Sequence, residues 1–386
     1  MPSAQTIFDP RPYEKVRLPL SEAESLPAWC YTSEAFLERE IERVFLKTWI
    51  FLGRADELPK PGDYLCMDTA GGPVILIRDR DGGIRAFANS CRHRGARLLS
   101  GKGNCRAIVC PYHSWTYGLD GALAGALHME QTKGFDRARY GLTPVRLEEW
   151  QGFLFVNFDP KAESLLDYFG DMPQKLGSHN FSDMVCVRRT EYDLASNWKL
   201  LIENAIEDYH TATVHAATLG VQNAEDIVTR GNWDSLFVPG TQSIAVLPNE
   251  AAPFPLIPTL DAKARQGSYF TALFPNTQFA CTMDCMWWLT FVPNGARRCK
   301  AQFGFCFPKS TVARPDFREK AEPYFRRWDL GIAEDNGTGE LQQVGLESAL
   351  RQPGPLSWKE SAVHNFYNWL LDRVLDPPFS TRVAAE

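Results

Sequence analysis

The sequence predicts an α+β protein of two domains, an all-β domain followed by a domain that mixes helices with strands. Its 386 residues, 44% of them hydrophobic and 23% charged, are enough for two globular cores. Strand patterns fill the chain up to Asp159-Pro160, and helical patterns begin after this turn. We therefore expect an N-terminal helical segment at 1–45 that packs on the second domain, the all-β domain at 46–159 and the second domain at 160–386.

The N-terminal helix is indicated by residues that recur at helical spacing behind a capping residue. Thr32 or Ser33 can cap it, because a hydroxyl accepts a hydrogen bond from the first free N–H groups of a helix. The residues that share its buried face are Leu37, Ile41, Val44, Phe45 and Thr48.

The all-β domain is indicated by two hairpins and a final strand. The segments 74–77 and 84–87 flank an Asp-Gly-Gly turn, and residues 115–123 bracket the turn at Asp120-Gly121. A last strand at 153–158 precedes the domain boundary.

The second domain shows helical and strand patterns in turn. We expect helices at 197–215, 317–330 and 361–374, and strands at 269–274, 279–291 and 300–307. The stretch 237–258 contains five prolines and is therefore expected to be irregular. Long irregular loops often serve a function, so this one is either a lid over a pocket or a plain surface loop.

Charge and hydropathy exclude two classes of partner. The net charge is -6 and no basic block stands out, which excludes a protein that neutralises nucleic-acid phosphates. The apolar runs are far shorter than the roughly 20 residues that a membrane-spanning helix needs. The N-terminus does not resemble an export signal, so we expect the protein in the cytoplasm.

The first candidate site is the pair of motifs Cys91-x-His93 and Cys110-x-x-His113. A zinc finger groups two cysteines first and two histidines second, whereas here each motif carries one of each. This division lets two cysteines hold one iron of a [2Fe-2S] cluster and two histidines the other, which is the Rieske arrangement. Zinc remains the alternative. Cys105 fits neither motif and is interpreted as a packing residue.

The second candidate site lies in the expected helix 197–215. His210 and His215 are candidate ligands of a mononuclear iron(II), which two histidines and one carboxylate bind on one side. Glu207, three residues before His210, is the carboxylate placed beside that ring. The candidate catalytic residues are Asn204, Glu207 and Asp208. The third iron ligand is expected from Glu334 or Asp335.

Together, in this order, the two motifs resemble those of the catalytic α subunit of Rieske non-heme iron oxygenases, the ring-hydroxylating oxygenases. The resemblance implies a Rieske domain followed by a catalytic domain in which a large antiparallel sheet grips a long helix. It also implies that Asp335 is the third iron ligand and that Glu207 bridges to a Rieske histidine of a neighbouring subunit.

The resemblance further implies a multicomponent enzyme that hydroxylates a small organic substrate with O2. Electrons from NAD(P)H would arrive through a flavin/[2Fe-2S] reductase, possibly with a ferredoxin. The expected assembly is a homotrimer, or α3β3 with a small second subunit. Family members form trimers because the two metal centres of one chain are far apart, whereas those of adjacent chains are close.

The substrate is expected to be an aromatic compound or a quaternary ammonium compound. Many aromatic dioxygenases have Asp at the position of Glu207, and Glu resembles the branch that acts on compounds such as carnitine. Cation–π attraction holds such cations in aromatic cages. The candidate cage residues are Tyr269, Phe270, Trp287 and Trp288.

Two readings without oxygenase activity remain open. A Rieske electron carrier would explain the first motif pair but would leave the second domain and its histidines without a purpose. A zinc-stabilised protein that binds an apolar molecule would need no redox centre. Iron content and colour separate these readings.

Overall fold

The computed structural model describes residues 7–375, which divide into two compact units. One unit is Phe45–Leu165, and the other joins the described residues up to Val44 with those from Leu166 on. The first unit extends a few residues beyond Asp159 because its own groups bind the next segment. Trp49 Nε1 donates to the Glu163 carbonyl, and the Leu165 N–H donates to Glu148.

The unit at 45–165 is built of three small antiparallel sheets, in the orders β1-β10-β9, β4-β3-β2-β5 and β6-β7-β8. Both expected hairpins are present, as β3 with β4 and β7 with β8. The strands are β1 (Ile50–Arg54), β2 (Asp63–Thr69), β3 (Gly72–Arg78), β4 (Ile84–Ala88), β5 (Lys102–Asn104), β6 (Ile108–Val109), β7 (Thr116–Tyr117), β8 (Leu123–Gly125), β9 (Arg146–Trp150) and β10 (Phe153–Asn157).

The other unit is built on one seven-stranded antiparallel sheet in the order β11-β17-β16-β15-β14-β13-β12. This confirms the large antiparallel sheet that the family resemblance implied. Its strands are β11 (Met184–Leu194), β12 (Glu225–Asp226), β13 (Trp233–Pro239), β14 (Gly267–Leu273), β15 (Thr277–Cys281), β16 (Met286–Pro293) and β17 (Cys299–Pro308).

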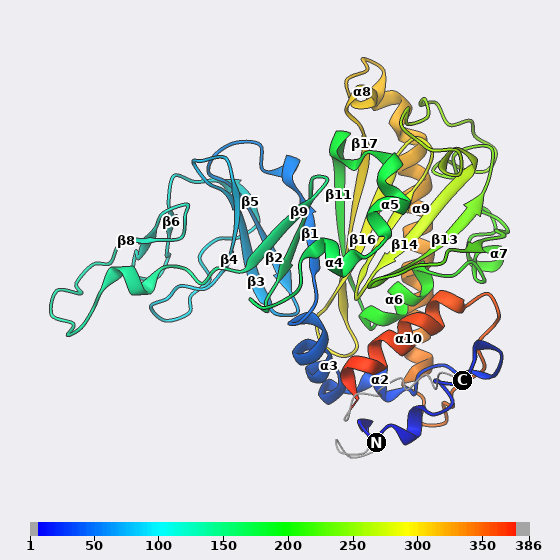
Figure 1. The fold of residues 1–386 in the computed structure, drawn as a ribbon, viewed down its shortest axis with the longest axis horizontal. Helices are drawn as coiled ribbons and strands as arrows, with labels where there is room; N and C mark the ends of the chain where they lie inside the picture. The colour runs from blue at the N-terminus through cyan, green and yellow to red at the C-terminus, as the bar shows by residue number, and fades with distance from the viewer. Residues whose placement is uncertain (1–6, 376–386) are drawn as a thin grey trace. The chain divides into compact units, whose positions relative to one another are not determined.

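The long helix α9 (Phe317–Leu346) packs against β16 and β17 on one face of this sheet (Figure 1). The stacked rings of Trp328 and Phe305, 4.4 Å apart at 12°, mark this contact. The other helices are α2 (Trp29–Thr32), α3 (Glu34–Glu40), α4 (Leu165–Phe169), α5 (Met172–Leu176), α6 (Trp198–Ala205), α7 (Thr211–Val214), α8 (Lys309–Val312) and α10 (Ser361–Val374).

Three elements differ from the expectation. The expected strand at 279–291 is two strands, β15 and β16, because the Thr282 side chain bonds to Asp284 and Cys285 and closes a turn without Gly or Pro. The expected helix at 317–330 continues as α9 to residue 346 through several glycines. The expected helix at 197–215 stops at Ala205 and resumes only as the single turn α7.

Of the stretch 237–258, which was expected to be irregular, the first three residues end β13 and the others are irregular and pack on the sheet and α9. Phe254 stacks on Phe317 and Tyr324 at 5.5 and 5.3 Å. Within residues 7–375, no helix combines the length and the apolar character that crossing a membrane requires.

Candidate functional site

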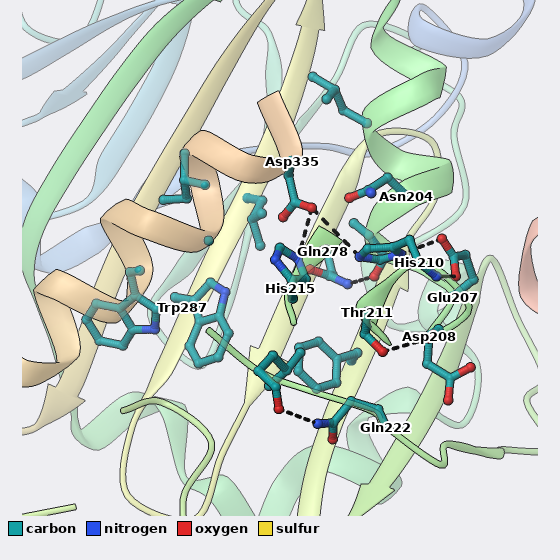
Figure 2. A pocket seen from close by; sticks show the side chains of 18 of the residues that line it. Asn204, Glu207, Asp208, His210, Thr211, His215, Gln222, Gln278, Trp287 and Asp335 are labelled. Carbon is teal, nitrogen blue, oxygen red and sulfur yellow. Dashed lines mark hydrogen bonds and ion pairs between the residues drawn. The ribbon is translucent and has the colours of Figure 1, made fainter. Parts of the chain in front are cut away.

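His210, His215 and Asp335 converge at one point of the unit that contains the large sheet (Figure 2). One ligand atom from each lies within 4.8 Å of the others. Asp335 Oδ1 is 3.0 Å from His215 Nε2 and 3.7 Å from His210 Nε2. The two histidines flank the short turn α7, and α9 supplies the aspartate. The residues expected as a ligand set from the sequence are therefore close together.

Carboxylates hold the second ring nitrogen of both histidines. Glu207 Oε1 is 2.5 Å from His210 Nδ1, and Glu334 Oε2 is 2.7 Å from His215 Nδ1. The Thr218 hydroxyl donates to the same Glu334 oxygen at 2.6 Å. A carboxylate at Nδ1 fixes the tautomer that leaves Nε2 free to bind a metal. Glu334 is thus a hydrogen-bond partner of His215. Its position next to Asp335 in the sequence did not reveal this role.

The site owes its shape to the early end of α6. The Asn197 side chain begins this helix by accepting the Lys199 N–H, and the Gln278 side chain donates to the free Ala205 carbonyl at its end. Glu207 therefore lies in a turn, where its Oε2 accepts the N–H of Tyr209 and of His210. The expectation that one continuous helix presents both residues is wrong, although the two side chains do meet.

Asn204 and Asp208 both line the pocket beside the three ligands. Asn204 is the nearer one to Asp335 (Figure 2). Asp208 bonds to Lys359 Nζ at 2.9 and 3.1 Å and accepts the Ala224 N–H. Asp208 therefore anchors the loop around the site.

The donor set suits an iron(II) ion. Two imidazole nitrogens and one carboxylate oxygen on one side form the facial arrangement of non-heme iron oxygenases, with the remaining positions open. Burial disfavours a charged His215, but Asp335 and Glu334 raise its pKa overall. This excess of negative charge is what a bound cation would neutralise.

The pocket next to the ligands has aromatic and aliphatic walls. Phe270 of β14, Trp287 of β16 and Phe303 of β17 line it, together with Trp328 of α9. Of the candidate cage residues, Phe270 and Trp287 take part, whereas Tyr269 and Trp288 are not among the lining residues, because neighbouring strand residues face opposite ways. Of the stretch 237–258, only Val238 of β13 is among the lining residues, so the irregular part of the stretch does not cover this pocket.

In the other unit, the four candidate cluster ligands are divided by depth. Cys91 and Cys110 are only 3% and 2% exposed, whereas the rings of His93 and His113 lie nearer the surface, 4.7 Å apart. Arg94 Nη2 lies 3.1 Å from His113 Nε2, so a guanidinium group adjoins this ring. The donor set fits a Rieske cluster with a buried thiolate end and an outer imidazole end.

Hydrogen-bond donors surround the two sulfur atoms. Burial opposes ionisation of Cys110, but the N–H groups of Tyr112 and His113 lower the pKa of its thiol overall. The Tyr117 hydroxyl lies 3.2 Å from Cys91 Sγ. Gly95 adopts a φ of +75°, which lets its N–H turn back to the Cys91 carbonyl. Donors to a ligand sulfur, such as the N–H groups at Cys110, stabilise the thiolate.

Comparison with known families finds a match for each of two parts of the chain. Residues 181–376 match the ring hydroxylating alpha subunit (catalytic domain), and residues 48–136 match the Rieske [2Fe-2S] domain. The first match covers just over half of the chain. The chain belongs to the family of ring-hydroxylating α subunits. It therefore joins a Rieske domain to the catalytic domain of that family, as the two motifs indicated.

Several characterised proteins are similar to this family member. The carnitine monooxygenase oxygenase subunit of Escherichia coli (strain K12) is 39% identical over 50% of the chain, and the chain spans 53% of that protein's length. The glycine betaine monooxygenase oxygenase subunit of Pseudomonas aeruginosa is 29% identical, with 91% of the chain and 89% of that protein covered.

A solved structure of the quaternary ammonium Rieske monooxygenase CntA with L-carnitine superposes with a TM-score of 0.77. The two chains are 26% identical, with 93% of this chain and 98% of that one covered.

The sequence analysis named Glu334 only as an alternative iron ligand and missed Thr218; these two side chains bond to each other, and Glu334 bonds to His215 Nδ1. It also missed Arg327 of α9, which lies in the pocket wall. The other aromatic lining residues, such as Phe291 and Phe303, were interpreted only as strand residues. Only the alternation of side chains between the two faces of β16 and β17 could have placed these two residues on one face. Nothing in the sequence distinguishes Arg327 from the other charged residues of α9.

Proposed function

We propose that this chain is the terminal oxygenase component of a multicomponent Rieske oxygenase that hydroxylates a small organic substrate. One observation carries the proposal: a single chain holds two separate donor sets, two cysteines with two histidines, and two histidines with a carboxylate. When bound, the [2Fe-2S] cluster would supply electrons and the iron(II) would supply dioxygen activation. An NAD(P)H-dependent flavin/[2Fe-2S] reductase is the proposed electron source, with or without a ferredoxin.

Each residue near the iron site has a proposed task that its contacts support. His210, His215 and Asp335 hold the ion, and Glu207 and Glu334 orient the two rings. The apolar walls keep bulk water away from the reacting substrate. Asn204 is proposed to position groups beside Asp335, and Asp208 to keep the loop in place through Lys359.

Glu207 is proposed to connect His210 with a Rieske histidine of a neighbouring copy. Its carboxylate already bonds to His210 Nδ1, and two exposed aromatic residues, Tyr209 and Trp358, adjoin Asp208 and its partner Lys359 in sequence. In the Rieske unit, Tyr112 beside His113 is also 60% exposed. Exposed aromatic residues are typical of interfaces. These surfaces support contact between copies of the chain, and the proposed assemblies are a homotrimer or α3β3.

Relatives and pocket chemistry support a compact substrate with an N-methyl or aromatic group. The similar proteins from E. coli and P. aeruginosa are named for carnitine and glycine betaine. Phe270 and Trp287 offer ring faces that bind either a quaternary ammonium group or an aromatic ring. All ten cysteines are free, which supports the reducing conditions of the cytoplasm as the location.

Metal content and oxygen uptake test this function. Protein purified without air should be brown and hold about three irons per chain, two in the cluster and one mononuclear. With a reductase and NADH, it should consume O2 when N-methylated amines or aromatic acids are added. Two irons per chain would instead indicate an electron carrier, and a colourless zinc protein a binding module.

Two variants separate the centres. Cys110→Ala should abolish the absorbance and paramagnetic resonance of the cluster but leave mononuclear iron bound. Glu207→Gln should keep both metals and lose turnover, because electrons no longer pass between them. Turnover at the wild-type rate in Glu207→Gln would show that this side chain is not the connection.

A further inference from the structure

Arg327 places a buried positive charge in the wall of the substrate pocket. It lies on α9, two turns before Asp335, and only 7% of the residue is exposed. Gly331, one turn further along the helix, leaves room for it. A Cβ atom at Gly331 would lie 3.4 Å from Arg327 Nη1 and 4.0 Å from His215 Cε1. The guanidinium group therefore lies close to the proposed iron site (Figure 2 shows the ligands).

No described residue neutralises this charge by direct contact. Arg327 Nε is buried without a hydrogen-bond partner, and the guanidinium has no ion pair among residues 7–375. Arg327 Cζ lies over the ring of Trp287, 5.6 Å from its centroid. Burial lowers the pKa of Arg327, and the more distant Asp335 and Glu334 oppose this effect. A buried charge without a partner lowers the stability of the fold by several kcal/mol, so buried charged side chains are usually paired with a group of opposite charge.

The acidic residues nearby are already engaged. Glu207 binds His210, Glu334 binds His215 and Thr218, and Asp208 binds Lys359. Asp335 faces the two histidine Nε2 atoms, where the metal would take its charge. Within residues 7–375, no carboxylate therefore pairs with Arg327, and this side chain lines the pocket that would hold substrate.

We propose that Arg327 binds a carboxylate of the substrate and so makes this a site for carboxylic acids. This inference rests on the proposed function and narrows its substrate class. A planar guanidinium binds a carboxylate through two parallel hydrogen bonds, which fixes the orientation of the bound molecule as well as its charge. The aromatic walls then hold the remainder of the acid beside His210 and His215.

The proposal predicts that compounds which lack the carboxylate of an otherwise similar acid bind weakly. A quaternary ammonium compound without a carboxylate would bring a second positive charge near Arg327 and leave the guanidinium unpaired. Glycine betaine should therefore bind better than choline, which replaces the carboxylate with an alcohol. In the same way, benzoate should bind better than benzyl alcohol. The two pairs distinguish a betaine from an aromatic acid.

Binding of these four compounds can be measured without turnover. Trp287 and Trp328 line the pocket, so quenching of tryptophan fluorescence in the iron-loaded protein, checked by calorimetry, reports occupancy without a reductase. We expect one acid to bind at least 10-fold more tightly than its alcohol. In Arg327→Gln this preference should fall roughly 10- to 100-fold, and Arg327→Lys should retain part of it.

Arg326→Gln provides the matched control. Arg326 is the preceding residue of the same helix, but it is exposed, pairs with Glu250 and does not line this pocket. The control should keep the preference for the acid, and melting curves of all variants should show that each remains folded. Equal binding of acid and alcohol to the wild-type protein in both pairs, or an unchanged preference in Arg327→Gln, would overturn the proposal. Loss of oxygen uptake with retained acid binding would instead count against the proposed oxygenase function alone.

Discussion

Single residues decide what each centre can bind, and hydrogen bonds to ligand atoms tune it. Tyr117 shows this in the Rieske domain, because its hydroxyl lies 3.2 Å from Cys91 Sγ and also accepts the Arg92 N–H at 3.1 Å. A donor to a ligand sulfur stabilises the more negative, reduced cluster and so raises its reduction potential.

Tyr117→Phe should therefore lower the reduction potential of the cluster. A hydrogen bond to a charged group contributes about 1 kcal/mol or more, which is roughly 40 mV for a one-electron couple. Protein-film voltammetry or a redox titration followed by paramagnetic resonance measures the change. Tyr64→Phe, on β2 of the same unit and outside the cluster motifs, serves as the control. A potential equal to that of the wild type would show that the Tyr117 hydroxyl does not donate to Cys91.

Glu203 is a second residue whose surroundings set its charge. Burial raises the pKa of Glu203 to about 8, although hydrogen bonds from Tyr31 and Tyr367 at 2.9 and 3.0 Å oppose this. The folded protein therefore keeps this proton at pH values where the unfolded chain, near its ordinary pKa of 4.5, has lost it. The stabilisation is complete below about pH 4.5 and is lost as the pH rises to about 8.

Glu203→Gln should remove this dependence on pH, because an amide stays neutral while it keeps bonds to both tyrosines. The melting temperature of the wild type should fall relative to that of the variant between pH 6 and pH 9. At pH 9 the variant should be the more stable of the two. Parallel melting profiles over this range would show that Glu203 is ionised at neutral pH in the folded protein.

Residues with a functional spacing could be recognised in the sequence, and others could not. The two Cys-His motifs and the pair His210 and His215 are recognisable because metal chemistry restricts both residue type and spacing. Arg327 carries no such mark, since it follows another arginine on a helix with many charges. Its role depends on burial, which only the packing of α9 on the sheet determines.

Helices and strands were predictable where local pattern and packing agree. The helix expected at 361–374 is found as α10 with the same limits, because its apolar residues recur regularly without Gly or Pro. The sequence pattern predicts α9 only as far as residue 330, yet this helix packs against α6 and the sheet and extends to residue 346. At Gly339 a Cβ atom would lie only 2.7 Å from Leu201 Cδ2, so a small residue is what this contact requires.

Two glycine-to-alanine changes should therefore have opposite effects on stability. A Cβ atom at Gly337 of α9 would have no neighbouring atom within 4 Å, so Gly337→Ala should stabilise the helix by about 0.5–1 kcal/mol. At Gly304 of β17, a Cβ atom would lie 2.0 Å from the indole of Trp288, so Gly304→Ala should destabilise by about 1–3 kcal/mol.

Denaturant unfolding of both variants measures these changes. Neither glycine lines the iron pocket, so iron content should stay at the wild-type value in each. Destabilisation by Gly337→Ala would contradict an open environment around that turn of α9. Unchanged stability of Gly304→Ala would mean that Trp288 can move without loss of packing.

At the scale of the whole molecule, the two donor sets lie in separate units, Phe45–Leu165 and the rest of the described chain. An oxygenase of this kind needs both centres, because the cluster must pass electrons to the iron site. The proposed homotrimer solves this if the cluster of one copy serves the iron site of the next. The outward position of His93 and His113 and the contact of Glu207 with His210 are both compatible with such a route.

Mixed trimers test this arrangement. Cys110→Ala lacks the cluster and His210→Ala lacks an iron ligand, so each variant alone should be inactive. The two variants are co-expressed in equal amounts with different tags. At one quarter of the interfaces, the cluster of a His210→Ala chain then faces the iron site of a Cys110→Ala chain. Activity should therefore return to about one quarter of the wild-type value per chain, because cyclic symmetry makes all interfaces alike. A double variant carrying both changes on one chain, mixed with wild-type chains, provides the control for assembly. If electrons instead pass within one chain, the mixture of the two single variants should stay inactive however it is assembled.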